Sequence, residues 1–437
     1  MFGFKLLLLL LWQLFYLSSA RPAIENHSTR LLERHGVKRV DFRLASQEEG
    51  LYYTELDTAM RDILLQVRNL SQQSVLTQFD WIRARNVEAG RMQLPVLQSA
   101  RFPCDLSAGR SPAIPNDVRQ LRPGDIDIVA TCGDSSNSGT GILGLGELDA
   151  YVEYRGYAYT GGGFETWRTA LTLPNILKLY NPGLYGYAAG HSLGADVNVS
   201  RFNLAEPMLN IQDLPFQAHV LVERFRRDPR VNLREHWKLL SIQVGANDLC
   251  SELCHAPSPE HFLRVVARQL HETFRILKEH VPRLLINFIV HPDIDELLSL
   301  LARIPPKCAQ RMPYFCSCYN SYNNRTLYDA AKRFLHLQLS IAALPEFRSA
   351  DFAIVTHGIL RNISSLWSEQ RFMDRHFFAN DCIHYSQLGH AVLAKQLWNN
   401  MVGQADLTSV EEWRKPFKHF QCPTLSSPYL RTESDVF

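Results

Sequence analysis

Apolar segments of strand length alternate with amphipathic segments of helix length from residue 120 onwards, and this alternation constrains the fold of the 437-residue chain more than any other feature. Such an order is typical of a mostly parallel sheet, because each connection between parallel strands carries a helix across one face. We therefore predict an α/β protein whose sheet is covered on both faces. The expected strands span 126–132, 237–244, 283–290 and 352–356, and the expected helices span 167–178, 215–227, 261–280, 327–344 and 385–401.

The first 20 residues have the composition of a cleavable signal peptide. Lys5 precedes a leucine-rich run, and the small residues Ser18, Ser19 and Ala20 follow it, which predicts cleavage after Ala20. An uncleaved membrane anchor is the alternative, but the unbroken apolar run is shorter than the roughly 20 residues that span a bilayer. No later stretch of the sequence is long and apolar enough to span one. We predict a secreted protein or one in the lumen of the secretory pathway, with the lysosome as an alternative destination.

Residues 21–100 carry apolar side chains at helical spacing and no repeated strand pattern, which predicts a helical amino-terminal extension. Prolines at 103, 112, 115 and 123 then indicate a wrapping arm that leads into the first strand. The expected organisation is a signal peptide at 1–20, the extension at 21–100 and one main domain at 101–437.

Cysteine usage and glycosylation sequons agree with the secretory pathway. All nine cysteines lie beyond residue 20, which fits an oxidising compartment. Cys132 lies inside the first apolar strand, so we expect it to be unpaired while the other eight form four disulfides of open connectivity. A zinc site at Cys308, Cys316 and Cys318 is a weaker alternative, because the usual paired spacings and a histidine pair are missing. Sequons, which indicate surface positions and glycosylation, start at Asn26, Asn69, Asn198, Asn324 and Asn362.

The charge of the chain argues against nucleic acid as a partner. The net charge is +2, whereas nucleic-acid binders carry a clear basic excess or a basic stripe. Arg224, Arg226, Arg227 and Arg230 form a local cluster that suits peripheral contact with an anionic lipid surface. A charge run is more often simply a solvated face, and this reading stays open.

Ser135 is the first candidate nucleophile. It follows Gly133 and Asp134 directly after the first strand, at the carboxyl edge where open α/β sheets bind their ligands. Gly133 permits a sharp exit from the strand, and Asp134 can accept hydrogen bonds from the amides of the turn. Most Gly-Asp-Ser tripeptides are ordinary turns, so this candidate needs support from elsewhere in the chain.

Ser192 is the rival nucleophile, because Gly190-His191-Ser192-Leu193-Gly194 matches the G-x-S-x-G nucleophile elbow. The elbow requires a strand before the serine and a helix of small residues after it. A sequon and two β-branched residues follow here instead. This context is wrong for an elbow, and we favour the first candidate.

Two later stretches support a serine hydrolase site at the edge of the sheet. Asn247 and Asp248 end the second strand, and the amide of Asn247 can donate to an oxyanion, although an ordinary Asn-Asp turn is the alternative. Asp381 precedes His384 by three residues, a spacing that lets the carboxylate orient the ring as in a Ser-His-Asp triad. His390 is the competing imidazole, and its place inside the last helical pattern favours packing.

In order and spacing these motifs resemble the GDSL, or SGNH, hydrolases, and the chain further resembles their phospholipase B branch. The similarity covers roughly residues 102–432. It implies a three-layer, flavodoxin-like α/β/α sandwich and hydrolysis of acyl esters of phospholipids and lysophospholipids without a metal or other cofactor. The segments that carry the resemblance to the branch are Thr172-Leu173-Pro174-Asn175-Ile176-Leu177 with Tyr180-Asn181-Pro182, Asp213-Leu214-Pro215, Trp237-Lys238-Leu239 and Leu397-Trp398-Asn399-Asn400-Met401.

The resemblance implies a role for each motif residue. Ser135 is the nucleophile, His384 is the general base and then the acid, and Asp381 orients His384. Asn247 and the backbone N–H of Ser135 are expected to hold the oxyanion. The family's third donor is a glycine N–H in an Asn-x-Ala-x-x-Gly segment, and Met208 stands at that glycine position here. A backbone donor survives this change only if the backbone angles suit a residue with a side chain.

The predicted function is a secreted serine ester hydrolase that releases fatty acids from phospholipids and lysophospholipids through an acyl-serine intermediate. Two alternatives stay open. One is an esterase acting on acetyl or other short-chain esters, and the other is a catalytically impaired lipid-binding protein, which Met208 and the unusual Ser136-Asn137-Ser138 sequence motivate. Neither a metal nor a transmembrane segment after signal cleavage is expected.

Overall fold

The structure is a computed structural model, and it describes residues 58–107, 109–146, 152–310, 316–360, 374–403 and 417–434. The predicted signal peptide and the sequons at Asn26 and Asn362 lie outside the described residues. The three described sequon residues, Asn69, Asn198 and Asn324, are all exposed.

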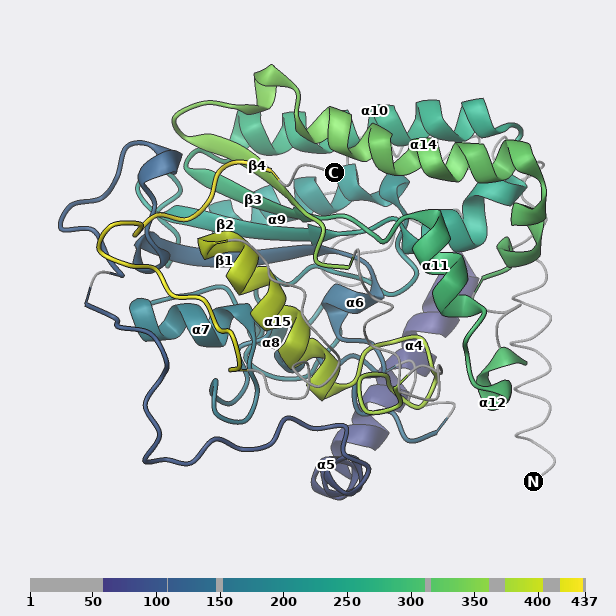
Figure 1. Cartoon of the computed structure of the whole chain (residues 1–437), viewed down its shortest axis with the longest axis horizontal. Helices are drawn as coiled ribbons and strands as arrows, with labels where there is room; N and C mark the ends of the chain where they lie inside the picture. The colour runs from purple at the N-terminus through teal and green to yellow at the C-terminus, as the bar shows by residue number, and fades with distance from the viewer. Residues whose placement is uncertain are drawn as a thin grey trace.

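Four parallel strands form the central sheet in the order β1-β2-β3-β4 (Figure 1). Their side chains are almost entirely buried, as expected for a sheet with helices on both faces. The four predicted strands are confirmed to within one residue at each end. The strands are β1 (Ile126–Gly133), β2 (Trp237–Gln243), β3 (Leu284–Ile289) and β4 (Phe352–His357).

A broken fifth segment extends the sheet beyond β1. The N–H of Thr131 donates to the carbonyl oxygen of Phe202 (2.9 Å), and the N–H of Leu204 donates to that of Thr131 (2.8 Å), in a parallel pairing. The spatial order is then that of a flavodoxin-like sheet, in which the winding reverses between β1 and β2. Ligands of such sheets bind at this reversal, outside the carboxyl ends of the strands.

Helices cover both faces of the sheet, so the predicted three-layer sandwich is confirmed (Figure 1). The helices α9 (Leu214–Arg227), α10 (Pro259–His280) and α14 (Arg325–Ala342) cover one face. The helices α7 (Leu173–Tyr180) and α15 (Gln387–Val402) cover the other. Shorter helices lie in the connections: α6 (Ser135–Ser138), α8 (Val197–Ser200), α11 (Ile294–Leu301) and α12 (Pro306–Ala309).

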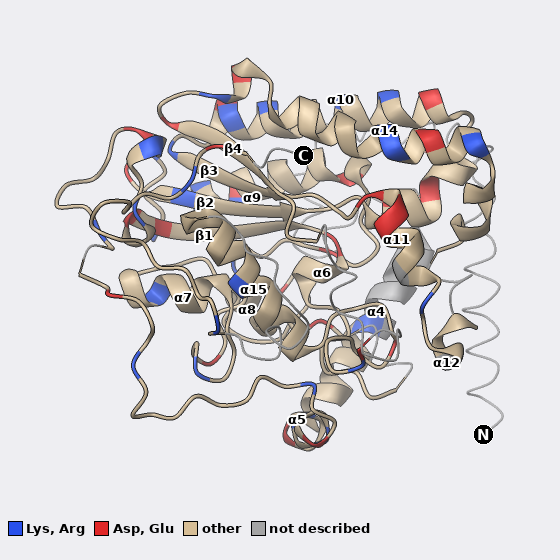
Figure 2. Cartoon of the chain, in the orientation of Figure 1, with Lys and Arg blue, Asp and Glu red and all other residues tan. Residues whose placement is uncertain are grey.

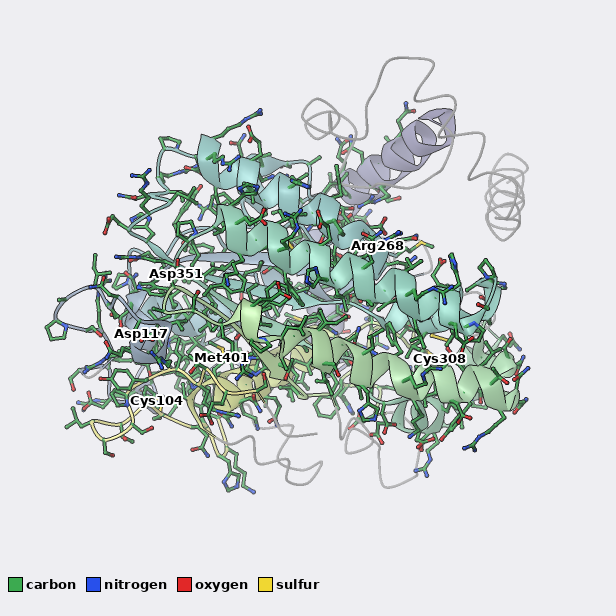
Figure 3. All side chains as sticks on the ribbon, turned by 90° about the horizontal axis from the view of Figure 1, so that it is seen from above. Cys104, Asp117, Arg268, Cys308, Asp351 and Met401 are labelled. Atoms are coloured by element: carbon green, nitrogen blue, oxygen red, sulfur yellow. A yellow bond between two sulfur atoms is a disulfide. The ribbon has the colours of Figure 1, made fainter. Side chains whose placement is uncertain are left out.

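The outer layer formed by α10 and α14 shows the amphipathic pattern that predicted it. Charged side chains gather on the helices and loops, whereas the strands are nearly free of them (Figure 2). Seen from above, α10 and α14 run side by side over the sheet, with Arg268 on α10 (Figure 3). Within the described residues no helix is long and apolar enough to cross a membrane.

Four of the five predicted helices in the main domain are confirmed to within two residues at each end. The helix predicted at 167–178 is corrected, because α7 begins only at Leu173. Thr172 accepts the N–H of Asn175 (3.2 Å), and Pro174 occupies the second helical position. Such a cap followed by proline fixes the start of a helix, so residues 167–169 form a turn and residues 170–171 are irregular instead.

In the described part of the predicted extension, residues 58–88 contain the helices α4 (Thr58–Leu76) and α5 (Phe79–Glu88), whereas residues 89–100 contain no helix. The chain after α5 packs into the interior. The N–H of Gln93 donates to Gln387 at the start of α15 (2.6 Å), and its side chain accepts the N–H of Leu171 (2.7 Å). Residues on both sides of position 100 therefore share one core.

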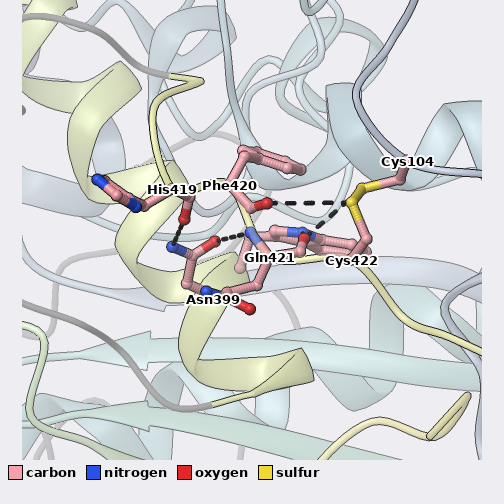
Figure 4. Close-up of a disulfide and its surroundings, with 7 residues drawn as sticks. Cys104, Asn399, His419, Phe420, Gln421 and Cys422 are labelled. Atoms are coloured by element: carbon pink, nitrogen blue, oxygen red, sulfur yellow. Dashed lines mark hydrogen bonds between the residues drawn. A yellow bond between two sulfur atoms is a disulfide. The ribbon is translucent and has the colours of Figure 1, made fainter.

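The predicted cysteine inventory is confirmed, and the zinc alternative is wrong because its three cysteines are all disulfide-bonded. Cys132 is free and buried. Figure 4 shows one bridge beside Asn399 of α15, whose amide donates to the carbonyl oxygen of His419 and accepts the N–H of Gln421, both at 2.9 Å. The bridges are Cys104–Cys422, Cys250–Cys316, Cys254–Cys318 and Cys308–Cys382.

Candidate active site

Ser135 is the first residue of α6, directly beyond the carboxyl end of β1 (Figure 1). Gly133 ends the strand with φ of 120°, and a Cβ atom there would lie 1.9 Å from the carbonyl oxygen of Gln243 on β2. Only glycine fits this position. The Oδ1 atom of Asp134 accepts the N–H of Ser136 at 3.0 Å and caps the helix. The predicted strand-to-turn exit therefore fixes the backbone of Ser135 at the edge of the sheet.

Asp381 and His384 form the carboxylate–imidazole pair that their spacing predicts. The Oδ2 atom of Asp381 lies 2.6 Å from Nδ1 of His384. The other carboxylate oxygen accepts the N–H groups of Ile383 and His384, each at 3.0 Å. The side chain of Asp381 is only 2% exposed and that of His384 14% exposed. The turn thus holds the imidazole ring of His384 in one orientation, while part of the ring stays accessible to solvent.

The electrostatics of this pair connect it to the turn that carries Ser135. Burial by itself lowers the pKa of His384, but the charge of Asp381 and the hydrogen bond to it, with a smaller contribution from Asp134, raise the pKa above its ordinary value. Burial raises the pKa of Asp134 to about 6, against the opposing charge of His384. Because such mutual effects weaken with distance, His384 lies near Asp134 and hence near the β1–α6 turn.

Met208 keeps the backbone conformation of a glycine. Its φ is 62°, in the left-handed region, which costs a residue with a Cβ atom roughly 1–2 kcal/mol. The residue is 59% exposed. In the part of the chain that the structure describes, no acceptor bonds the N–H of Met208 or that of Ser135. Both amides are therefore available to a ligand.

Two residues that follow β2, Asn247 and Asp248, bind the loop that carries Met208. Asn247 uses one amide N–H to bond the carbonyl oxygen of Leu209 (2.9 Å), which leaves its second N–H. The buried carboxylate of Asp248 accepts the N–H of Ile211 (3.1 Å). The Asn-Asp motif is thus more than a local turn, since both side chains bind the loop at 203–211.

A buried ionic network anchors the same loop. Glu206 donates its N–H to the carbonyl oxygen of Gly133 (2.9 Å), and its carboxylate pairs with Arg68 of α4 (2.9 Å) and with Arg155 (3.2 Å). Glu153 also pairs with both arginines, and the side chains of Glu153 and Arg155 are fully buried. The helix α4 therefore reaches the loop two residues before Met208.

The rival candidates occupy structural positions. No strand lies in residues 152–191, directly before Ser192. The hydroxyl of Ser192 is buried without a partner in the described residues, and its carbonyl oxygen accepts the Nε–H of Arg155 (2.9 Å). His390 accepts the N–H of Tyr159 (3.2 Å), and burial lowers its pKa to about 3. That neither residue catalyses stays a prediction.

The arginine cluster does not form one free basic patch. Arg224 donates to the carbonyl oxygens of Arg201 (2.5 Å) and Gly194 (2.8 Å). Arg227 pairs with Glu223 (2.7 Å), and Arg230 pairs with Asp228 (2.8 Å). Local acceptors take up most of this charge, which argues against a dedicated lipid-docking role.

Sequence reasoning missed two contributors to the site. Arg68 forms an ion pair with Glu206, which lies 138 residues later in the sequence, and no local sequence pattern links the two residues. Asn203 was visible as the first residue of the Asn-x-Ala-x-x-Gly segment. Its side chain donates to the carbonyl oxygen of Asn137 (3.0 Å) and accepts the N–H of Ala205 (3.2 Å), which ties the loop to α6.

The fold and the motif residues gathered at its switch point define a class of protein, the carboxylic ester hydrolases of α/β architecture. The GDSL-like Lipase/Acylhydrolase family matches residues 129–397, and the chain belongs to this family.

Two curated relatives extend the similarity. The chain is 32% identical over 333 residues to "Phospholipase B1, membrane-associated" of Rattus norvegicus, covering 74% of this chain and 22% of the relative. It is 30% identical over 353 residues to the protein of the same name in Homo sapiens, covering 78% and 24%. The chain thus spans less than a quarter of the length of these relatives.

Proposed function

We propose that the chain is a secreted hydrolase that releases fatty acids from phospholipids and lysophospholipids through an acyl-serine intermediate. Its family and the phospholipase B relatives support a lipid ester as substrate. Its four disulfides support an oxidising compartment. The observation that carries the mechanism is the 2.6 Å contact between Asp381 and His384. The mutual effects of His384 and Asp134 on their pKa values support a place for the ring beside the turn of Ser135.

In this mechanism the Oγ atom of Ser135 forms a bond to the ester carbonyl carbon, and Nε2 of His384 takes the hydroxyl proton. Asp381 stabilises the imidazolium through Nδ1. The bond from the carbonyl carbon to the alcohol oxygen then breaks, and His384 returns the proton to the leaving alcohol. Water attacks the acyl-serine by the same route, which releases the fatty acid and restores the hydroxyl of Ser135.

Three donors are proposed to stabilise the oxyanion: the N–H groups of Ser135 and Met208 and the second amide N–H of Asn247. Their availability supports this role, since no described residue accepts from the two backbone groups. Losing one such donor lowers the rate by about 10² to 10³. The glycine-like backbone of Met208 supports an active site rather than an impaired one.

A product assay tests the proposal. A phospholipid with different acyl chains at its two positions, and lysophosphatidylcholine, are incubated with wild type and Ser135→Ala, and free acids are identified by mass spectrometry. We expect long-chain acids from wild type and none above background from the variant. Faster release of acetate from short esters than of fatty acids would instead favour the short-chain esterase. No release by folded wild type would contradict the proposal.

A further inference from the structure

A small cavity lies beside the turn that carries Asp381 and His384. Its volume is about 60 Å³, and Ala379, Asn380 and Cys382 of that turn line it together with Arg91 and Arg375. Cys308, the disulfide partner of Cys382, closes one side, on the opposite side of the molecule from Cys104 (Figure 3). The cavity therefore borders the catalytic turn directly.

Neither arginine of this cavity forms an ion pair with a carboxylate of the described residues. Arg91 is only 7% exposed, and the bond that its guanidinium makes among the described residues runs from Nε to the carbonyl oxygen of Arg375 (3.4 Å). Arg375 is exposed and likewise pairs with no described carboxylate. The negative charge that acts on Arg91 is that of Asp381, whose carboxylate already binds His384.

Burying a charge without an ion-pair partner is unfavourable, so a largely buried arginine beside a second cation favours the binding of an anion. The planar fork of arginine matches the oxygens of phosphate in a bidentate way. A cavity of about 60 Å³ exceeds several-fold the space that one water needs, and it suits a compact tetrahedral anion. We propose that Arg91 and Arg375 form a binding site for a phosphate-type oxyanion beside the catalytic turn.

Two sources share this chemistry, free phosphate and the phosphodiester of a lipid headgroup. Cys382 lies two residues before His384, and the phosphodiester of a glycerolipid is only a few bonds from its ester carbonyls. The headgroup source rests on the proposed function, because it requires a phospholipid at Ser135. Binding of free phosphate does not depend on hydrolysis.

Isothermal titration with inorganic phosphate tests the site without turnover. We expect saturable binding to wild type, and affinity at least about tenfold lower in Arg375→Ala, the loss that two or more charge-assisted hydrogen bonds imply. Arg333→Ala, which removes an exposed arginine of α14 paired with Glu260, is the matched control and is expected to bind like wild type. Arg91→Met is a second variant. If it does not fold, the titration of Arg375→Ala still tests the site, because Arg375 lies at the surface.

The two sources of the bound phosphate group are distinguished by the ratio of kcat/KM for lysophosphatidylcholine to kcat/KM for an uncharged monoacylglycerol with the same acyl chain. A headgroup site predicts that Arg375→Ala lowers the ratio about tenfold and that phosphate inhibits competitively. A free-anion site predicts an unchanged ratio with phosphate binding still lost. The proposal is overturned if phosphate binds wild type and Arg375→Ala equally, or not at all, and the ratio is unchanged. An inactive wild type that still binds phosphate would sink the proposed hydrolysis but not this site.

Discussion

Replacing Met208 by glycine probes the least family-like position of the site. The residue has φ of 62°, and a left-handed backbone costs a residue with a side chain roughly 1–2 kcal/mol. Glycine removes this cost but gains freedom in the unfolded chain, an offset of about 0.4–1 kcal/mol. We therefore expect Met208→Gly to raise the free energy of unfolding by up to about 1.6 kcal/mol. Met208→Ala, which keeps the Cβ atom, should leave it unchanged.

The same pair of variants separates the backbone from the side chain in catalysis. The proposed donor is the N–H, which both variants keep, so kcat for a short ester should stay within about threefold of wild type, far from the 10² or more that loss of a donor causes. A side chain that limits the acyl route would give both variants the same gain on long chains. The assays are thermal unfolding and turnover of esters of graded chain length. Destabilisation by glycine, or a hundredfold loss of kcat, would refute the reasoning.

Three further predictions follow from the anchoring of the site. His384 must be neutral to accept a proton and its pKa is raised, so kcat/KM should fall with decreasing pH at a midpoint above about 6.5. Asp381→Asn should lower this midpoint and should lower kcat by about 10⁴. A midpoint that does not move in Asp381→Asn would contradict the pairing of the two residues. Arg68→Met takes a partner from Glu206 and should lower kcat about tenfold by shifting the loop, with partial rescue by Arg68→Lys; equal kcat in all three proteins would argue against this role. Gly133→Ala places a Cβ atom 1.9 Å from a backbone oxygen and should abolish folded product, measured as secreted yield and circular dichroism, so a well-folded variant would show that the strand exit is not constrained.

Local patterns predicted most of the sheet and the catalytic pair. The strands are continuous apolar runs and the helices are amphipathic, so each element shows its own period. Asp381 and His384 are three residues apart, and a single turn brings them together. The start of α7 was misplaced because the capping residue Thr172 and the proline after it interrupt an otherwise helical spacing.

The remainder depends on tertiary contacts that leave no local signal. A positive φ at Met208 is imposed by the bonds that hold the loop on both sides, whereas methionine itself carries no such preference. Arg68 meets Glu206 only because α4 packs against the segment that carries Glu153, through Val75 and the bonds of Gln72 to the backbone of Glu153. Disulfide connectivity likewise follows from the fold, since eight cysteines allow 105 pairings.

Covalent labelling with a fluorophosphonate tests the central claim most directly, because it reports the reactive serine itself. We expect one label per molecule, mapped by mass spectrometry to Ser135, in wild type and in Ser192→Ala, and no label in Ser135→Ala with secretion unchanged. A label on Ser192, or an unlabelled folded wild type, would contradict the account.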